Sequence, residues 1–269
     1  MSEHAQTIDT TAAEAYEHYL VPSLFGLWAP DVVELANLRA GDHVLDVACG
    51  TGTATRLAAA YVTTAGRVVG LDLDPGMLEV ARALPASVGA AVEWRRGNAL
   101  ELPFDDNTFD AVLCLQGLQF FPDRVAGLAE MRRVLKSTGR LAVSVWSSLE
   151  YCKGHDALAR ALERQQVDAG AVRRPFSLGD AEELRAIVFE VGFRDVELRT
   201  VTKLARFASP KHFVDSIAAG APSSRHALTQ VPEQAQSMLV EDVSATLQPY
   251  LDEDGVAIPV ESHLLRAQP

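Results

Sequence analysis

The sequence predicts an α/β protein with a mostly parallel sheet, and three observations support this fold class. Short runs rich in β-branched residues alternate with segments of helical pattern, as they do in parallel βαβ units. The first run is followed at once by a glycine-rich turn and an alanine-rich helical segment. An acidic residue, Asp72, ends the second run. Open α/β sheets bind ligands at the ends of such strands, so these features indicate a binding site.

Five short apolar runs in the first half of the chain predict strands. Helices are predicted over residues 53–61 and 123–136, and another begins at Pro75, whose fixed φ suits a first helical turn. The predicted strands are residues 43–49, 67–73, 92–97, 110–116 and 140–146.

The pattern changes after residue 146. Helices are predicted over 155–166 and 180–191, and a long strand over 193–207. The segment 209–250 is helical in pattern, and 256–265 reads as a last strand. The sequence shows no repeat and no low-complexity tract, which favours one domain over residues 1–269.

Composition and charge narrow the function. The chain is 48% hydrophobic and 22% charged, as a globular protein is, and its net charge is −12. A protein that grips a phosphate backbone usually shows a basic face. Here basic residues cluster no further than the pairs Arg95-Arg96, Arg132-Arg133 and Arg173-Arg174. Nucleic acid is therefore not expected as a partner.

The cysteines and the first residues indicate a soluble, cytoplasmic protein. Cys49, Cys114 and Cys152 are odd in number and lack C-x-x-C spacing, so neither a disulfide framework nor a metal site is expected. Residues 1–20 carry acids rather than a basic start and an apolar run, unlike a signal peptide. No apolar stretch approaches the roughly 18 residues needed to span a bilayer, so no membrane association is expected.

The strongest local feature is the segment 44–53, VLDVACGTGT. Glycines at a strand-to-helix turn, here Gly50 and Gly52, let the backbone approach a ligand, and the following helix offers free N–H donors. Asp72 follows Gly52 by 20 residues, a spacing that suits a carboxylate accepting hydrogen bonds from ribose hydroxyls. The sequence therefore predicts a nucleoside cofactor.

Two details favour S-adenosylmethionine over a dinucleotide. A dinucleotide-binding turn needs a third glycine near the pyrophosphate, and residues 53–55 are Thr-Ala-Thr instead. Asp46 precedes the turn, where its charge would oppose a pyrophosphate. A cofactor that carries an ammonium and a sulfonium group tolerates that carboxylate.

Four sequence motifs follow one another along the chain: LDVACGTG, GLDLDPGML, GNALELPFDDNTFDAVLC and RRVLKSTGRLAVSVW. Together they resemble class I S-adenosylmethionine-dependent methyltransferases, in particular the branch of the ubiquinone/menaquinone-biosynthesis and natural-product enzymes. The resemblance implies a Rossmann-like, seven-stranded, mostly parallel sheet with an antiparallel last strand and helices on both faces. It covers roughly residues 40–146, the expected cofactor-binding core. Residues 1–39 would form a helical cap, and 209–250 a helical insertion before the last strand.

The same resemblance implies a set of cofactor-binding residues. Asn98 departs from the aspartate that is frequent in the family, but its side-chain oxygen can still accept a hydrogen bond from the adenine amine. The methionine portion and ribose would be held by Asp46, Cys49, Gly50, Gly52 and Asp72, the adenine by Leu73, Met77, Asn98 and Ala99, and the methyl-bearing end by Gln116.

The residues that handle the methyl acceptor are less well defined. His155 follows the fifth predicted strand and is a candidate general base, the alternative being a surface histidine that opens a helix. Gln119, in LQGLQFF, is equally consistent with the acceptor pocket and with the core, whereas Phe121 is expected in the core. His212, His226 and His263 are weaker candidates.

The two flanking segments contribute further expectations. Since N-terminal helices of the family often cover the cofactor, Tyr19 and Trp28 are candidates for the pocket. Tyr16 and Phe25 are expected to pack an amphipathic helix on the sheet. The insertion at 209–250 would cover the acceptor pocket, or it would form a dimerisation surface; the sequence does not separate a lid from a homodimer interface.

The predicted function is methyl transfer from S-adenosylmethionine to oxygen or carbon of a small acceptor, such as a phenol, a quinone or a hydroxylated natural product. A nicotinamide-dependent oxidoreductase shares the fold, but it should show the full glycine triplet and a catalytic Tyr/Lys pair, and neither is found. A non-catalytic cofactor-binding protein is the other alternative, and the glycine turn with Asp72 favours the enzyme.

Overall fold

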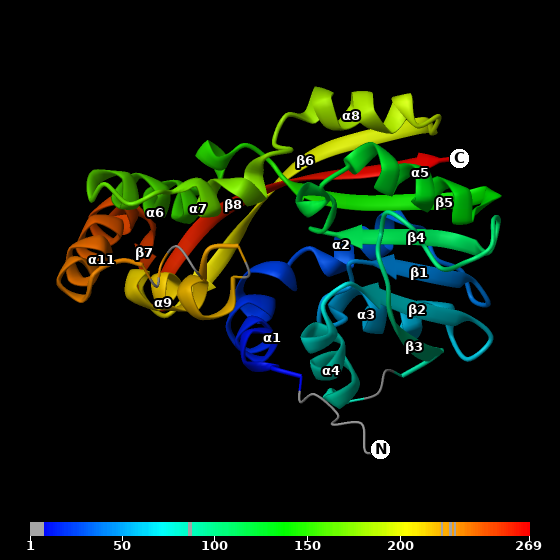
Figure 1. Cartoon of the computed structure of the whole chain (residues 1–269), viewed down its shortest axis with the longest axis horizontal. Helices are drawn as coiled ribbons and strands as arrows, with labels where there is room; N and C mark the ends of the chain where they lie inside the picture. The colour runs from blue at the N-terminus through cyan, green and yellow to red at the C-terminus, as the bar shows by residue number, and fades with distance from the viewer. Residues whose placement is uncertain (1–7, 86–87, 222, 226–227, 229) are drawn as a thin grey trace, which may run out of the picture.

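The computed structural model describes residues 8–85, 88–221, 223–225, 228 and 230–269, and it is built around one sheet (Figure 1). The strand order is β3-β2-β1-β4-β5-β8-β6. The first five strands in the chain are mutually parallel. They are β1 (His43–Val47), β2 (Arg67–Asp72), β3 (Ala91–Arg96), β4 (Phe109–Leu115) and β5 (Leu135–Trp146).

The last long strand closes the sheet in the antiparallel direction. β8 (Gly255–Gln268) lies between β5 and β6 (Arg194–Phe207) and is antiparallel to both. The two-residue strand β7 (Leu251–Asp252) pairs with the start of β8. The mostly parallel sheet with an antiparallel last strand is therefore confirmed, with β7 as an eighth strand in addition to the seven expected.

Helices cover both faces because neighbouring residues of a strand point to opposite sides. On one face, Val44 packs with α2 (Ala29–Leu35) and α3 (Thr53–Val62). On the other face, Leu45 packs with α5 (Arg124–Val134) and α8 (Ala181–Glu190). The central strands are buried on both sides, which explains why they read as continuous apolar runs.

Local capping fixes where several helices begin. The Asp74 side chain accepts a hydrogen bond from the Gly76 N–H at 2.7 Å and starts α4 (Pro75–Ala83), with Pro75 in the first turn. The Asp123 side chain accepts from the Ala126 N–H at 2.9 Å and starts α5. The helix predicted from Pro75 is therefore confirmed, and the helix predicted over 123–136 ends at Val134, where β5 follows directly.

The second half of the chain forms a helical lobe beside the sheet. In Figure 1, β6 and β8 run out of the sheet toward α6 (Lys153–Arg164), α9 (Pro210–Gly220) and α11 (Glu233–Leu247). Their antiparallel register extends from Arg194–Gln268 to Phe207–Val256. α9 and α11 lie within 209–250, so the helical character predicted for this segment is confirmed; Pro222 and His226 lie outside the described residues.

The N-terminal segment packs against α9 of this lobe. The N-terminal segment forms α1 (Thr11–Ala15) and then the π-helix η1 (Tyr16–Phe25). None of the helices in the described parts of the chain is long and apolar enough to cross a membrane. The remaining short elements are η2 (Leu118–Phe120), η3 (Leu149–Tyr151), α7 (Gly170–Arg173), η4 (Arg174–Phe176) and η5 (Gln248–Tyr250).

Candidate functional site

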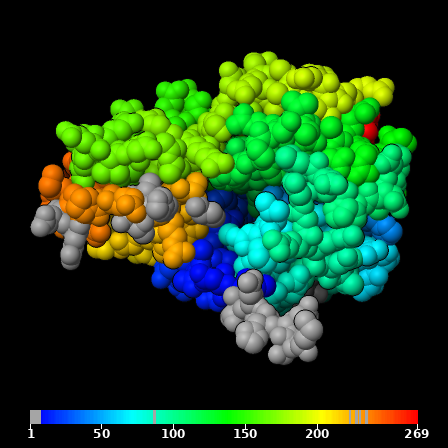
Figure 2. Space-filling model, viewed as in Figure 1, coloured from blue at the N-terminus to red at the C-terminus, as the bar shows by residue number. Residues whose placement is uncertain are grey.

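A cavity of about 470 Å³ lies at the carboxyl ends of the parallel strands. Its floor includes Gly50 after β1, Asp72 at the end of β2 and Gln116 after β4. Open α/β sheets bind ligands at this edge. Figure 2 shows the surface hollowed where the parallel part of the sheet meets the helical lobe, with N-terminal residues in dark blue inside the hollow.

Asp72 is held rigidly by two backbone donors. Its Oδ2 accepts a hydrogen bond from the Gly50 N–H at 2.8 Å, and its Oδ1 accepts one from the Asp74 N–H at 2.9 Å. Burial raises the pKa of Asp72, and these N–H bonds oppose the rise. Each carboxylate oxygen keeps a further lone pair, so Asp72 can accept from two neighbouring hydroxyls of a ribose.

The glycine turn has two distinct roles. A side chain at Gly50, whose φ is +56°, would meet only the Tyr16 ring, at 3.9 Å, so this residue keeps open the space above the turn. A Cβ at Gly52, whose φ is +87°, would lie 2.1 Å from the Trp94 ring. Gly52 therefore serves close packing of the turn, and it does not line the cavity.

Asp46 and Cys49 lie beneath the turn. The Thr55 hydroxyl donates to Asp46 Oδ2 at 2.6 Å, which ties the end of β1 to the first turn of α3. Burial raises the pKa of Asp46 to about 7 and that of the Cys49 thiol well above its usual value. Neither residue lines the cavity, so their predicted part in cofactor binding is better explained by support of the turn and stays a prediction.

The predicted adenine-binding residues all line this cavity, near the ends of β2 and β3. They are Leu73, Met77, Asn98 and Ala99. Leu73 is 64% exposed, so its apolar side chain is accessible from the cavity. Asn98 Oδ1 accepts from the Leu100 N–H at 3.0 Å, which orients the carboxamide.

Gln116 lines the cavity directly after β4. Its φ is +55°, and its carboxamide is held on both sides. Nε2 donates to Ser262 Oγ on β8 at 2.7 Å, and Oε1 accepts from Gln119 Nε2 at 3.2 Å. Gln119 is only 3% exposed and does not line the cavity, so the sequence's candidate acceptor-pocket residue is a buried support for Gln116.

His155 is not placed as a general base. Its ring lies among aromatic side chains, with centroids 5.1 Å from Phe176 and 5.5 Å from Phe213, and it does not line the cavity. Burial lowers the pKa of His155 to about 4, which keeps the imidazole neutral. The structure therefore places His155 inside the lobe, because the helix that it opens packs this residue there, and its role as a general base stays a prediction that this position does not favour.

The N-terminal aromatic residues exchange their predicted roles. Tyr16 and Phe25 line the cavity, with ring centroids 4.9 Å apart, whereas Tyr19 and Trp28 do not. Trp28 is fully buried and packs edge-on against Trp146 at 6.0 Å. An α-helical period does not hold for Tyr16, Tyr19 and Phe25 because they lie in the π-helix η1, whose i→i+5 bonds widen each turn; Trp28 lies beyond its end, as the N-cap of α2.

Tyr19 packs away from the cavity. Its ring lies 6.2 Å from that of His212 on α9, in an edge-on arrangement. The π-helix therefore points its cavity-lining side chains one way and Tyr19 toward the helical lobe. The weaker candidates His212 and His263 do not line the cavity either; Nε2 of His263 lies 2.9 Å from the Gly179 carbonyl oxygen.

Several cavity residues were not anticipated. Phe121 was expected in the core, but it lines the cavity and also fills the space above Gly127, where a Cβ would lie 2.5 Å from its ring. Arg174 and Ser223 reach the cavity from the second half of the chain. Sequence periodicity carries no signal for either, because their segments are short and irregular.

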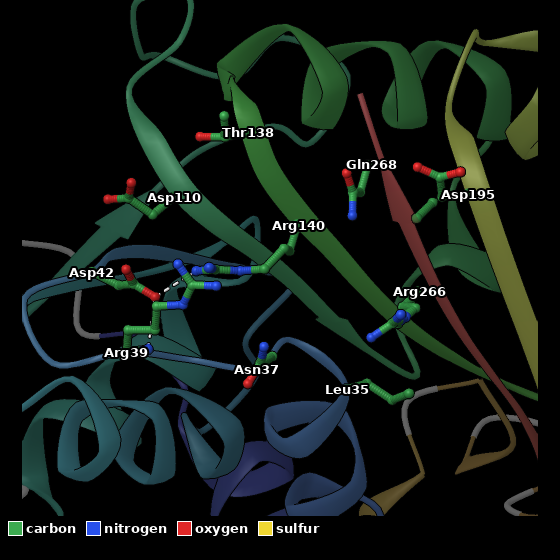
Figure 3. A pocket seen from close by; sticks show the side chains of 11 residues that line it. Leu35, Asn37, Arg39, Asp42, Asp110, Thr138, Arg140, Asp195, Arg266 and Gln268 are labelled. Carbon is green, nitrogen blue, oxygen red and sulfur yellow. Dashed lines mark hydrogen bonds and ion pairs between the residues drawn. The ribbon is translucent and has the colours of Figure 1, made fainter.

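A second cavity, of about 390 Å³, lies at the opposite edge of the sheet (Figure 3). Arg140 faces Asp42 there, at 2.5 Å, and Lys136 pairs with Asp110 at 2.8 Å. In these ion pairs, charged side chains near the amino ends of β1, β4 and β5 neutralise one another. The arrangement ties strand ends together and lies away from the edge where α/β sheets bind ligands.

Comparison with known proteins agrees with this geometry. The family described as "Methyltransferase domain" matches residues 45–143. The ubiquinone/menaquinone biosynthesis C-methyltransferase UbiE of Cronobacter sakazakii is 34% identical over 190 residues, which are 65% of this chain and 76% of that protein. The demethylmenaquinone methyltransferase of Symbiobacterium thermophilum is 44% identical over 115 residues; the match spans 42% of this chain and 46%, about half, of that relative.

Solved structures agree on the fold. A putative methyltransferase from an antibiotic biosynthesis pathway of Anabaena variabilis superimposes with a TM-score of 0.65 at 15% identity, over 92% of this chain and 98% of that one. Fold and site thus define an α/β protein with a nucleoside site at the carboxyl edge of its sheet. The chain belongs to the class I S-adenosylmethionine-dependent methyltransferases of the ubiquinone/menaquinone type.

S-adenosylmethionine is therefore the cofactor, and the residues present fit it. The paired oxygens of Asp72 suit the ribose hydroxyls, and the space above Gly50 suits the methionine portion. When bound, the cofactor supplies a methyl group activated by its attachment to a sulfonium. The chain itself positions the reacting partners and excludes water.

Proposed function

We propose that this enzyme methylates a small aromatic acceptor of the quinone or phenol class, at a ring carbon or at oxygen. The observation that carries the proposal is the wall of the cavity beyond Gln116, which is formed by Phe25, Phe120, Phe121 and Pro122. Flat apolar side chains around a few polar groups suit an aromatic ring. The matched relatives are named as a demethylmenaquinone methyltransferase and a ubiquinone/menaquinone biosynthesis C-methyltransferase, which supports the same class of acceptor.

Each end of the cavity has its own task in this proposal. Asp72 and Asn98 hold the nucleoside of the cofactor, with Leu73 and Met77 against the adenine. Gln116, fixed by Ser262 at 2.7 Å, lies where the two ends meet and orients the reacting groups. Tyr16 and Phe25 cover the cavity and keep water out.

We extend the proposal to the organisation of the chain. Residues 1–269 act as one methyltransferase domain, with 1–39 as a cap and 209–250 as a cover for the acceptor. The cover is supported by Ser223, which lines the cavity. The enzyme works in the cytoplasm on small molecules and not on nucleic acid, in keeping with its net charge of −12, and a homodimer is the alternative use of the insertion.

The test is calorimetric titration with S-adenosylmethionine, S-adenosylhomocysteine and NAD, followed by transfer of labelled methyl to a panel of phenols, quinols and hydroxylated polyketides. Micromolar binding of both adenosyl compounds and labelling of an aromatic acceptor are expected. Binding of NAD alone would contradict the proposal in favour of hydride transfer. Tight cofactor binding without transfer to any member of the panel would favour a non-catalytic protein.

A further inference from the structure

Arg174 is the single cation among the described residues that line the cavity. The acids of the cavity, Asp72 and Asp74, come from the segment after β2, at the nucleoside end. Arg174 comes instead from η4, which packs against η2 and its Phe120. The cavity is therefore polarised, with carboxylates where the ribose belongs and a guanidinium at the acceptor end.

The backbone that carries Arg174 is fixed in place. The next two residues, Pro175 and Phe176, are buried, and the Phe176 ring lies 6.3 Å from that of Trp146. Ser177 lies within hydrogen-bond reach of the Gln119 carbonyl oxygen at 3.4 Å and accepts from Arg124 at 2.6 Å. The guanidinium is thus presented from an ordered wall.

Arg174 forms no ion pair with any described residue of the protein. Its neighbour Arg173 pairs with Glu163 at 2.7 Å, and Arg124 pairs with Glu183 at 3.2 Å. No described carboxylate lies within 4.0 Å of the Arg174 guanidinium, although acidic residues outnumber basic ones in this chain by 36 to 24. An arginine left unpaired beside an apolar wall is suited to a carboxylate or another anionic oxygen.

The described lining residues include no histidine, and their two carboxylates, Asp72 and Asp74, follow β2 at the end assigned to the nucleoside. His155 is buried outside the cavity, and Gln119 does not titrate. Tyr16 lines the cavity, but burial raises the pKa of its phenol above the usual value, so it remains protonated. A neutral hydroxyl would have to give its proton to a base before or during methylation, whereas an acceptor that arrives ionised needs none.

We propose that Arg174 binds an anionic oxygen of the acceptor, so that the enzyme selects aromatic acceptors carrying a carboxylate or an ionised ring hydroxyl. This inference rests on the proposed function and narrows its substrate class. Arg174 is itself solvent-exposed, and the ion pair would form beside the apolar side chains that line the cavity, where a charge-assisted hydrogen bond is partly shielded from water. Arg174 is thereby a specificity-determining residue.

The experiment compares three probes on protein saturated with S-adenosylhomocysteine. They are 3,4-dihydroxybenzoate, its neutral amide 3,4-dihydroxybenzamide, and 4-nitrocatechol, whose visible absorption reports ionisation of a ring hydroxyl. The variants are Arg174→Gln, Arg174→Lys and the matched control Arg173→Gln, which removes a neighbouring arginine that does not line the cavity.

We expect the wild type to bind one of the two anionic probes at least about tenfold more tightly than the amide. The reason is that the amide lacks one charge-assisted hydrogen bond to Arg174, and such a bond changes affinity by roughly that factor. Arg174→Gln abolishes the preference, Arg174→Lys keeps part of it, and Arg173→Gln leaves it unchanged. A preference for the benzoate identifies a carboxylate. Nitrocatechol that ionises at lower pH on the wild type than on Arg174→Gln identifies a ring hydroxylate.

Equal affinities for all three probes, or no measurable binding of either anionic probe, would overturn the inference. So would an equal loss of affinity in Arg173→Gln. The proposed function fails separately: it requires S-adenosylhomocysteine binding and methyl transfer to some aromatic acceptor. Methyl transfer without a charge preference would remove only the role of Arg174.

Discussion

The two ends of the cavity are built in different ways. At the nucleoside end, Asp72 is held by backbone N–H groups at 2.8 and 2.9 Å, and its neighbours come from turns that directly follow β1, β2 and β3. At the acceptor end, the lining residues are side chains from η1, η2, η4 and residue 223, segments far apart in the sequence. A common cofactor can thus be kept by a rigid local frame, while acceptor specificity changes with the loops around it.

The largest effect is expected at the nucleoside end. Asp72→Ala removes an acceptor of two ribose hydroxyls and the anchor of the Gly50 N–H, so affinity for S-adenosylhomocysteine should fall at least about 100-fold. Calorimetry measures it. Glu79→Ala, a surface acid on α4 outside the cavity, is the control and should bind normally. If Asp72→Ala lowered the affinity for S-adenosylhomocysteine by less than threefold, the nucleoside end would not depend on Asp72 and the contrast between the two ends would not hold.

Asp46→Asn tests whether the residues under the turn support it rather than bind the cofactor. Burial raises the pKa of Asp46 from 3.8 to about 7, so the folded state holds a proton that the unfolded state releases. Stability is therefore lost as the pH rises from about 4 to about 7. The variant should remove this loss and be more stable at pH 8 by about 2 kcal/mol, an amount discounted for relaxation around the carboxylate.

Urea unfolding of the wild type and Asp46→Asn at pH 5 and pH 8 measures this difference. Cofactor affinity should stay within about fivefold, since the variant keeps an oxygen to accept from Thr55. A large loss of affinity with unchanged stability would show instead that Asp46 contacts the cofactor directly.

A smaller, selective effect is expected from the acceptor wall. Phe120→Ala removes one apolar face from the cavity, so the acceptor KM should rise about tenfold while the Kd of S-adenosylhomocysteine stays within twofold. Phe189→Ala, on the exposed face of α8, is the matched control and should change neither. If cofactor and acceptor affinities fell together, the two ends would be coupled and the contrast between them would not hold.

The smallest catalytic effect is expected from His155→Phe. Because His155 does not line the cavity, kcat/KM should stay within about twofold across the pH profile. Burial lowers the pKa of His155 from 6.5, its value in the unfolded chain, to about 4 in the folded protein. The folded wild type is therefore fully stable above pH 6.5 and loses stability as the pH falls from 6.5 toward 4. The variant should lose less stability between pH 7 and pH 5. A 100-fold drop in turnover would restore the general-base role.

The sequence alone determined the parallel core and most of the nucleoside end. Strand patterning, the glycine turn and the spacing to Asp72 depend on neighbouring residues, so the predicted strands over 43–49 and 67–73 end within two residues of β1 and β2. Leu73, Met77, Asn98, Ala99 and Gln116 were all expected at a cofactor site and all line the cavity. Their cofactor contacts remain predictions that the titrations above address.

Only the tertiary structure decided the acceptor end. The π-helix η1 placed Tyr16 and Phe25 in the cavity and Tyr19 outside it, Trp28 packs in the core before α2, and the packing of the lobe enclosed His155. Arg174 reaches the cavity because η4 packs on η2, a contact between segments some 55 residues apart. Turn chemistry and strand periodicity are local, and a sequence displays them directly. Which side chains from distant segments share one cavity depends on how the whole chain packs.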